Sequence, residues 1–328
     1  MGNLSQDCNG CDSNKEERDS ELHLSINGIT ETDPEKRRIL IQSKLGFEEK
    51  LTKLGKFLKN QKINQILDKI NPMVNRISFP EEITKTQKPN TFEEPAIRFH
   101  NGDIYKGNWN INNQRDGFGI NINPDGQIYV GLWDNDQMGD YGAFFDNEGN
   151  YYKGKLINGK CNGQGEICIF NKMKYVGEFL DDMPNGQGVM INLMDGSEYT
   201  GNVINGKKEG KGILKFKDGT IYEGEFKDDN YNGNGYIKYS NGSKYEGTFK
   251  DGKMDGNGKF TWEDGKTYIG NYINDKKHGF GKLIWNNNKY YEGNWVNNKQ
   301  HGEGLYYLKG KVLKGQFRFG KIITKNDE

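Results

Sequence analysis

Apolar and polar residues alternate in short runs through most of this chain, which is the pattern of β-strands with one covered face. In one run, Tyr222, Gly224 and Phe226 would lie on one face of a strand, with Glu223 and Glu225 on the other. A return run begins nine residues after Phe226 and alternates in the same way. Each pair of runs therefore predicts a β-hairpin with an aromatic face and a polar face.

The hairpin pattern repeats. A Tyr-x-Gly triplet opens each copy at steps of 23 or 24 residues, and a Gly-x-Gly pair follows, which in the second copy is stretched to Gly139-Asp-Tyr-Gly142. Asn-Gly or Asp-Gly dipeptides, such as Asp218-Gly219, separate the copies and predict tight turns with positive φ. The first return strand departs from the pattern, because Ile120 and Ile122 have the opposite parity. One hairpin cannot bury its own aromatic face, so the period predicts stacked hairpins.

The order Tyr-x-Gly-x-(Trp/Phe), short polar loop, Gly-x-Gly and Asp-Gly turn resembles the MORN (membrane occupation and recognition nexus) repeat over about residues 97–319. The resemblance implies an all-β fold: an elongated, twisted, single-layer antiparallel sheet of about nine to ten hairpins. It also implies a non-catalytic scaffold or adaptor that binds a partner peptide or helix in an aromatic groove, in a cytoskeletal or ciliary assembly such as an axoneme or basal body. The groove residues that follow from it are Tyr105, Trp109, Tyr129, Trp133, Tyr152, Tyr175, Phe179, Tyr199, Tyr222, Phe226, Tyr245, Phe249, Trp262, Tyr268, Tyr272, Trp285, Tyr291 and Trp295.

The N-terminal residues differ from the repeats in charge. Residues 1–35 carry nine acidic against two basic side chains, and we expect a disordered acidic tail. Residues 36–70 carry ten basic against three acidic side chains, with apolar residues at three- and four-residue steps. This pattern predicts a basic amphipathic helix or helix pair over 36–72, followed by a linker over 73–96. Its apolar face would pack on the protein's own sheet, bind a partner protein, or lie on an anionic membrane.

The extreme N-terminus offers a lipid anchor. Gly2 can be myristoylated once Met1 is removed, although Ser5 stands one place before the usual Ser or Thr. One chain anchors only marginally, so palmitoylation of Cys8 or Cys11, or the basic helix, would supply the second signal. An alternative function is therefore a peripheral membrane tether. A further alternative is a regulatory subunit of an enzyme, such as a lipid kinase, carried on another chain.

No residue pattern indicates catalysis, a cofactor or a metal. The Gly-x-Gly pairs precede strands and lack the Lys of a phosphate loop, and Asp228-Asp229 is interpreted as a solvated turn. His278 and His301 occupy one repeat position, and the Cys8–Cys11 pair has no second ligand pair for zinc. We therefore expect a protein that is not an enzyme.

Composition and charge limit the classes of partner and the cellular location that we expect. The net charge is zero, which does not favour nucleic acid as a partner. There is no signal peptide and no apolar run of about 18 residues, so we expect a cytoplasmic protein, at the cytoskeleton or cilium or anchored to a membrane. The tenth copy, at Leu313, is truncated before a polar tail over 320–328 and leaves a strand edge at which a homodimer could form.

Overall fold

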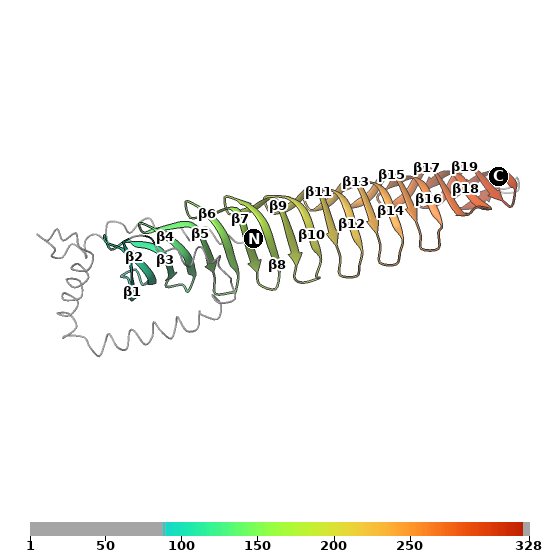
Figure 1. The fold of residues 1–328 in the computed structure, drawn as a ribbon. Coiled ribbons are helices and arrows are strands. Elements are labelled where there is room, and N and C mark those ends of the chain that lie inside the picture. Colours follow the sequence, from blue (N-terminus) through green and yellow to red (C-terminus); the bar gives the residue numbers. More distant parts are fainter. Residues whose placement is uncertain (1–87, 89, 324–328) are drawn as a thin grey trace, which may run out of the picture. The chain divides into compact units, whose positions relative to one another are not determined.

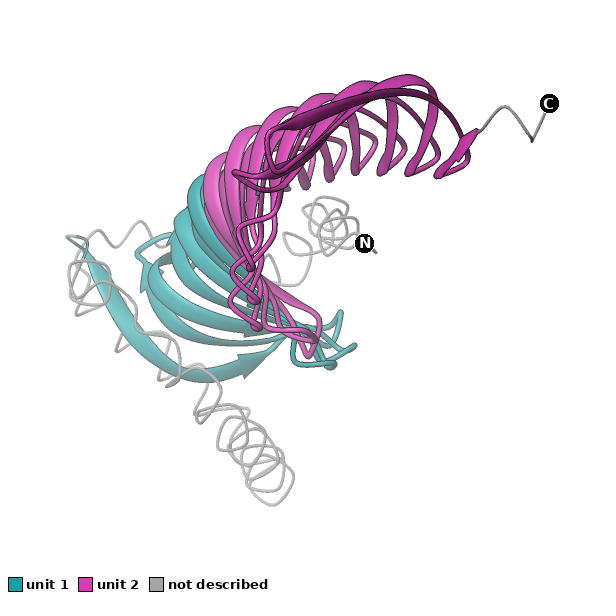
Figure 2. Cartoon of the chain, turned by 90° about the vertical axis from the view of Figure 1, so that its right-hand side faces the viewer, with its two compact units in different colours: residues 1–167 teal, residues 168–328 magenta. Residues whose placement is uncertain are grey.

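The structure, a computed structural model, describes residues 88 and 90–323. These residues form 21 antiparallel strands and no helix, which confirms the predicted all-β repeat array. The chain divides into two compact units, residues 1–167 and 168–328, and each is described by itself (Figure 2). The helix predicted over 36–72 lies outside the described residues.

Unit 1 is one layer of strands, in which each strand from β1 to β6 pairs with the next along the chain. Tyr105 pairs with Asn121, so Ile120 and Ile122 point to the opposite face, as their parity predicts. The first strand begins inside the range expected to be a linker. The strands are β1 Thr91–Arg98, β2 Ile104–Asn110, β3 Arg115–Ile122, β4 Ile128–Asp134, β5 Gln137–Phe145, β6 Tyr151–Ile157 and β7 Lys160–Ile169, which contains the unit boundary.

Unit 2 continues the hairpin pattern, and Figure 1 shows its strands following one another in chain order. From β8 onward each strand pairs antiparallel with the next. The last strand lies in the range predicted as a polar tail. The strands are β8 Met173–Leu180, β9 Met183–Asn192, β10 Glu198–Ile204, β11 Lys207–Lys215, β12 Ile221–Lys227, β13 Asn230–Lys238, β14 Lys244–Lys250, β15 Lys253–Thr261, β16 Thr267–Ile273, β17 Lys276–Asn286, β18 Lys289–Val296, β19 Lys299–Leu308, β20 Lys311–Arg318 and β21 Lys321–Ile323.

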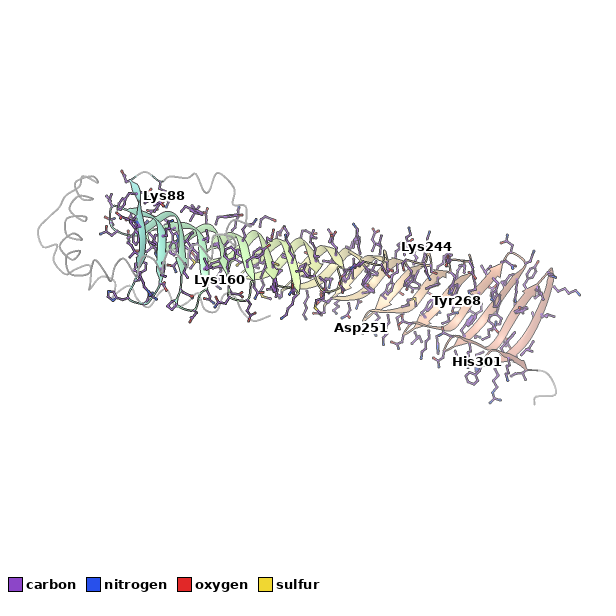
Figure 3. All side chains as sticks on the ribbon, turned by 90° about the horizontal axis from the view of Figure 1, so that it is seen from below. Lys88, Lys160, Lys244, Asp251, Tyr268 and His301 are labelled. Carbon is purple, nitrogen blue, oxygen red and sulfur yellow. The ribbon has the colours of Figure 1, made fainter. Side chains whose placement is uncertain are left out.

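The strands of unit 2 are joined by one kind of turn along one long side of the sheet and by another kind along the opposite long side. Lys244 and Asp251, near opposite ends of β14, lie on opposite long sides in Figure 3. Two-residue turns close the hairpins on the Asp251 side, and in Asp228-Asp229 both φ angles are positive, 47° and 69°. In the Asp-Gly and Asn-Gly turns between copies only the glycine is left-handed, as in Gly219 with φ 90°. The predicted turns with positive φ at the Asn-Gly and Asp-Gly dipeptides are therefore present, and the two-residue turns are a second kind, in which Asp and Asn themselves adopt the left-handed conformation.

A row of glycines crosses each unit. In unit 2, Gly224 pairs with Gly212 on one side and with Gly235 on the other, and the row continues in both directions. In unit 1, Gly131 pairs with Gly142. The second copy is therefore not stretched: Gly142 takes the normal place in the row, and Asp140 stands where other copies have their first glycine.

We call the face that carries the Tyr-x-Gly tyrosines and this glycine row the ring face, and the opposite one the outer face. The Tyr222 ring lies along the row, since a Cβ on Gly235 would fall 2.7 Å from its Cε2 atom. Phe226 meets Tyr222 edge to face, with ring centroids 5.0 Å apart, and meets Tyr199 of the preceding copy at the same distance. Aromatic pairs prefer this geometry, so each copy covers the rings of its neighbour and the stacked rings form the core.

Candidate partner-binding surface

Most of the residues expected to line a groove are part of this core. Tyr105, Trp133, Tyr222 and the other predicted groove residues, with two exceptions, are 0–6% exposed. The hydroxyl groups of the Tyr-x-Gly tyrosines in this set form hydrogen bonds within the sheet; that of Tyr222, for example, donates to the carbonyl oxygen of Glu225 at 2.7 Å. These rings stabilise the sheet, and their faces are not available to another molecule.

The two exceptions, Trp262 and Trp285, are only half-buried. They stand four residues beyond the second glycine of their copies, at the ends of their strands near the turns between copies. The same position in other copies of unit 2 holds Phe216, 36% exposed, half-buried Tyr239, and Leu308, 40% exposed. We call these five residues the terminal row. The period predicts their common face, but only the packing shows that they, unlike the tyrosines, keep accessible surface.

Neighbouring rings outside the terminal row contact some of its members. Tyr239 lies 5.9 Å from Phe260, whose ring is 4.6 Å from Trp262. Trp285 lies 5.9 Å from Tyr306. Members of the row are two strands apart, which is about 10 Å at the usual strand spacing. The row is therefore a line of large apolar surfaces at regular intervals along unit 2.

Three lysines lie against the tryptophans of the terminal row. Lys266 Nζ is 4.4 Å and Lys277 Nζ 5.1 Å from the centre of the Trp262 ring, and Lys289 Nζ is 4.9 Å from that of Trp285. Within the described residues none of these three ammonium groups forms an ion pair with a carboxylate. The row is therefore both aromatic and positively charged. Sequence reasoning missed these lysines because charged residues on the predicted polar loops were interpreted as solvated.

Lys277 is held in the least aqueous position of the three. Its ammonium group lies within 5.5 Å of the ring centres of Tyr268 and Trp295 as well as that of Trp262. Burial lowers the pKa of Lys277 below its usual value, and repulsion from Lys266 acts in the same direction. A carboxylate brought to this position would favour the charged form of Lys277 and offset the cost of its burial.

In unit 1 a basic residue is built into the ring face in a different way. The Arg115 guanidinium lies 3.9 Å from the centre of the Trp133 ring. Its Nε donates to Asp136 Oδ1 at 3.0 Å, and the side chain is 4% exposed. Arg115 therefore completes the core of unit 1, whereas the lysines of the terminal row remain half-exposed.

The residues proposed for lipidation, Gly2, Cys8 and Cys11, lie outside the described residues. Within the described range, no three His, Cys, Asp or Glu side chains are placed to hold a metal ion. The same range contains no helix of the length and apolarity needed to cross a membrane.

The repeated hairpin, the glycine row and the stacked rings define a β-hairpin repeat protein. Comparison with known families identifies which one. The MORN repeat family matches eight segments that together span more than half of the chain: 105–128, 152–168, 175–191, 199–221, 222–244, 245–267, 268–290 and 291–310. The chain belongs to the MORN repeat family, which confirms the resemblance seen in the sequence. No curated protein matches the chain.

Solved structures give weak similarities. The TCP domain of SAS-4 (dCPAP) from Drosophila melanogaster, in complex with a proline-rich motif of Ana2 (dSTIL), is 15% identical with a TM-score of 0.29, covering 44% of this chain and 77% of that one. The TCP10 domain of Danio rerio CPAP, in complex with a STIL peptide, is 14% identical with a TM-score of 0.22, covering 69% and 99%. Similarity at this level carries no argument about this chain.

Proposed function

We propose that the protein is a non-catalytic adaptor whose terminal row binds an acidic, apolar segment of a partner protein. The observation that carries this proposal is the placement of Lys266, Lys277 and Lys289 on half-exposed tryptophans, without a carboxylate partner in the described residues. Tryptophan and tyrosine surfaces of this kind supply most of the binding energy in protein interfaces. Apolar side chains of the partner would pack on the rings, and its carboxylates would pair with the lysines.

The spacing of the row suits a partner that runs along it. Members recur about every 10 Å, and residues seven apart on an α-helix are separated by about 10.5 Å. An amphipathic helix could therefore present one apolar residue to each of Tyr239, Trp262 and Trp285. An extended segment would reach the same rings at every third residue. The setting that we propose, from the family, is a cytoskeletal or ciliary assembly.

The proposal is tested by selecting a random peptide library on the full-length protein. Selected peptides should be acidic and apolar, and their affinity should fall as salt rises. Trp285→Ala and Lys289→Glu should each weaken binding at least about tenfold, which is about 1.4 kcal/mol.

Phe280→Ala is the matched control for the peptide selection. Phe280 is 58% exposed but stands on the outer face, between the two glycines of its Gly-x-Gly pair. Its replacement should leave peptide affinity unchanged. Peptides that bind Trp285→Ala and the wild type equally well, or that lose affinity with Phe280→Ala, would refute the proposed surface.

Association with the cytoskeleton has its own test. Full-length protein should co-sediment with microtubules or an axonemal fraction, and Trp285→Ala should reduce the sedimented fraction. If Trp285→Ala leaves co-sedimentation unchanged, the terminal row is not the surface that binds the cytoskeleton.

A further inference from the structure

The outer face of unit 1 is apolar at positions where several copies of unit 2 carry charged residues. Two cross-strand rows form an apolar cluster there: Ile104, Ile122, Ile128, Phe145 and Tyr151 in one, and Ile120, Val130 and Ala143 in the other. In unit 2 the position of Val130 holds Glu223 and Glu246, and that of Phe145 holds Lys238. All three of these are exposed.

The cluster is buried, although the described strands of unit 1 form a single layer. Val130 and Ala143 are 0% exposed, and Ile104, Ile122, Ile128 and Phe145 are 4–5% exposed. The burial is not a property of the position itself. Val176 and Ile269 stand at the position of Val130 in later copies, and they are 42% and 47% exposed. Something besides the neighbouring strands therefore covers the outer face of unit 1.

We propose that residues 36–72 of this same chain cover the outer face of unit 1. The segment has the required chemistry: Ile63, Ile66, Leu67 and Ile70 follow the spacing of one helical face, and lysines occupy the positions between its apolar residues. An amphipathic helix of this kind buries its apolar stripe against a sheet and leaves the lysines in water.

The chain length allows this contact. The described residues begin at Lys88, whose Nζ lies 2.8 Å from Asp134 Oδ1 at the end of β4. Residues 73–87 can span up to about 50 Å when extended. The cluster crosses five strands, β2 to β6, a width of about 19 Å, which a helix of about 13 residues covers. Residues 36–72 of a second copy could cover the same face, but the two molecules would then lose translational and rotational entropy on association.

The consequence is that the outer face of unit 1 binds the chain's own N-terminal segment, while the terminal row of unit 2 binds the partner. The apolar stripe of residues 36–72 is used within the molecule and is not free to lie on a membrane or to bind the partner of the terminal row. Unit 1 would then be a two-layered end to the repeat array, and its stability would depend on the N-terminal segment. Terminal repeats of stacked proteins need such a cap.

Amide hydrogen exchange on the full-length protein tests this inference. Peptides from residues 58–72 should exchange at least about tenfold more slowly than an unstructured chain. Val130→Glu should abolish this protection, and Ile269→Glu, at the same repeat position in unit 2, should leave it unchanged. Because Val130→Glu could unfold unit 1, Ile66→Glu provides a second variant that leaves the sheet sequence intact and should abolish the protection equally.

A photo-crosslinking amino acid at position 130 should capture residues 51–72 of the same chain, and the same amino acid at position 269 should capture none of them. Residues 58–72 that exchange at the unstructured rate in the wild type would overturn the inference. So would protection that disappears on dilution together with a dimer seen in sedimentation, since a second copy would then be the cover.

Discussion

The hydroxyl group of Tyr199 donates a hydrogen bond to the carbonyl oxygen of Asn202, 2.7 Å away on the same strand, and so holds its ring along the sheet. Below the ring lies Gly212, where a Cβ would fall 2.6 Å from the Tyr199 hydroxyl oxygen. Gly210, in the same Gly-x-Gly pair, has φ +65°, and a Cβ there would meet nothing within 4 Å. The two glycines of one motif are therefore required for different reasons, close approach and backbone conformation.

We predict that Gly212→Ala destabilises the protein by about 3 kcal/mol, because the added methyl group must displace a core ring. Gly210→Ala should cost only about 1–2 kcal/mol, the penalty for a left-handed alanine. Chemical denaturation of the full-length variants measures both. In a Tyr199→Ala background the added cost of Gly212→Ala should fall below about 1 kcal/mol. Equal costs for the two glycines in the wild-type background would contradict this account.

In several of the two-residue turns the second residue forms a hydrogen bond to the preceding hairpin. Asp229 Oδ1 accepts the backbone N–H of Lys208 at 3.0 Å, and the Asp229 N–H donates to the Lys208 carbonyl oxygen at 3.1 Å. In the next copy Gly252 makes only the second kind of bond, to the Tyr231 carbonyl oxygen. Asp229→Gly should therefore cost about 1 kcal/mol in unfolding free energy, as for one lost hydrogen bond.

The reverse substitution is the control for the turn contact. Gly252→Asn keeps a residue that tolerates positive φ and supplies an acceptor for the Tyr231 N–H, as Asn298 does for Lys277 at 2.9 Å. It should stabilise the protein by about 0.5–1 kcal/mol in the same denaturation experiment. A loss of stability in Gly252→Asn would mean that the side-chain bond does not determine the energy of this turn.

Buried tyrosines should make the sheet sensitive to alkali. Burial raises the pKa of Tyr199 and Tyr291 to about 12, above the value of about 10 in an unfolded chain. The folded state therefore holds these protons more tightly. The stability they contribute is fully present below about pH 10 and is lost as pH rises from about 10 to about 12.

Tyrosinate absorbance and circular dichroism, followed together during an alkaline titration, test this. Ionisation of the buried tyrosines should coincide with loss of the sheet, whereas in denaturant all tyrosines should ionise near pH 10. Tyr291→Phe should weaken the pH dependence of the denaturation midpoint between those two limits. Complete tyrosine ionisation near pH 10 with the sheet intact would contradict the burial of these rings.

Several features of the structure could be predicted because they depend on residues close in sequence. Alternation placed Tyr222 and Gly224 on one face, and the departure of Ile120 and Ile122 from the repeat pattern corresponds in the structure to isoleucines on the outer face. The interpretation of Asp228-Asp229 as a solvated turn agrees with its exposure, but the dipeptide alone did not show that both of its residues adopt positive φ.

The period of the sequence by itself determined the family, the hairpin and the glycine row, because each is set by spacing within one copy. Only the tertiary structure decided which aromatic residues are core and which remain accessible. The accessibility of a ring depends on what the next copy places over it. Phe226 meets Tyr199 edge to face and Tyr199 is 1% exposed, whereas Trp262, just beyond the end of β15, has Phe260 and two lysine side chains against it and remains half-buried. The burial of a ring depends on residues of the neighbouring copy, so the sequence of one copy does not predict it.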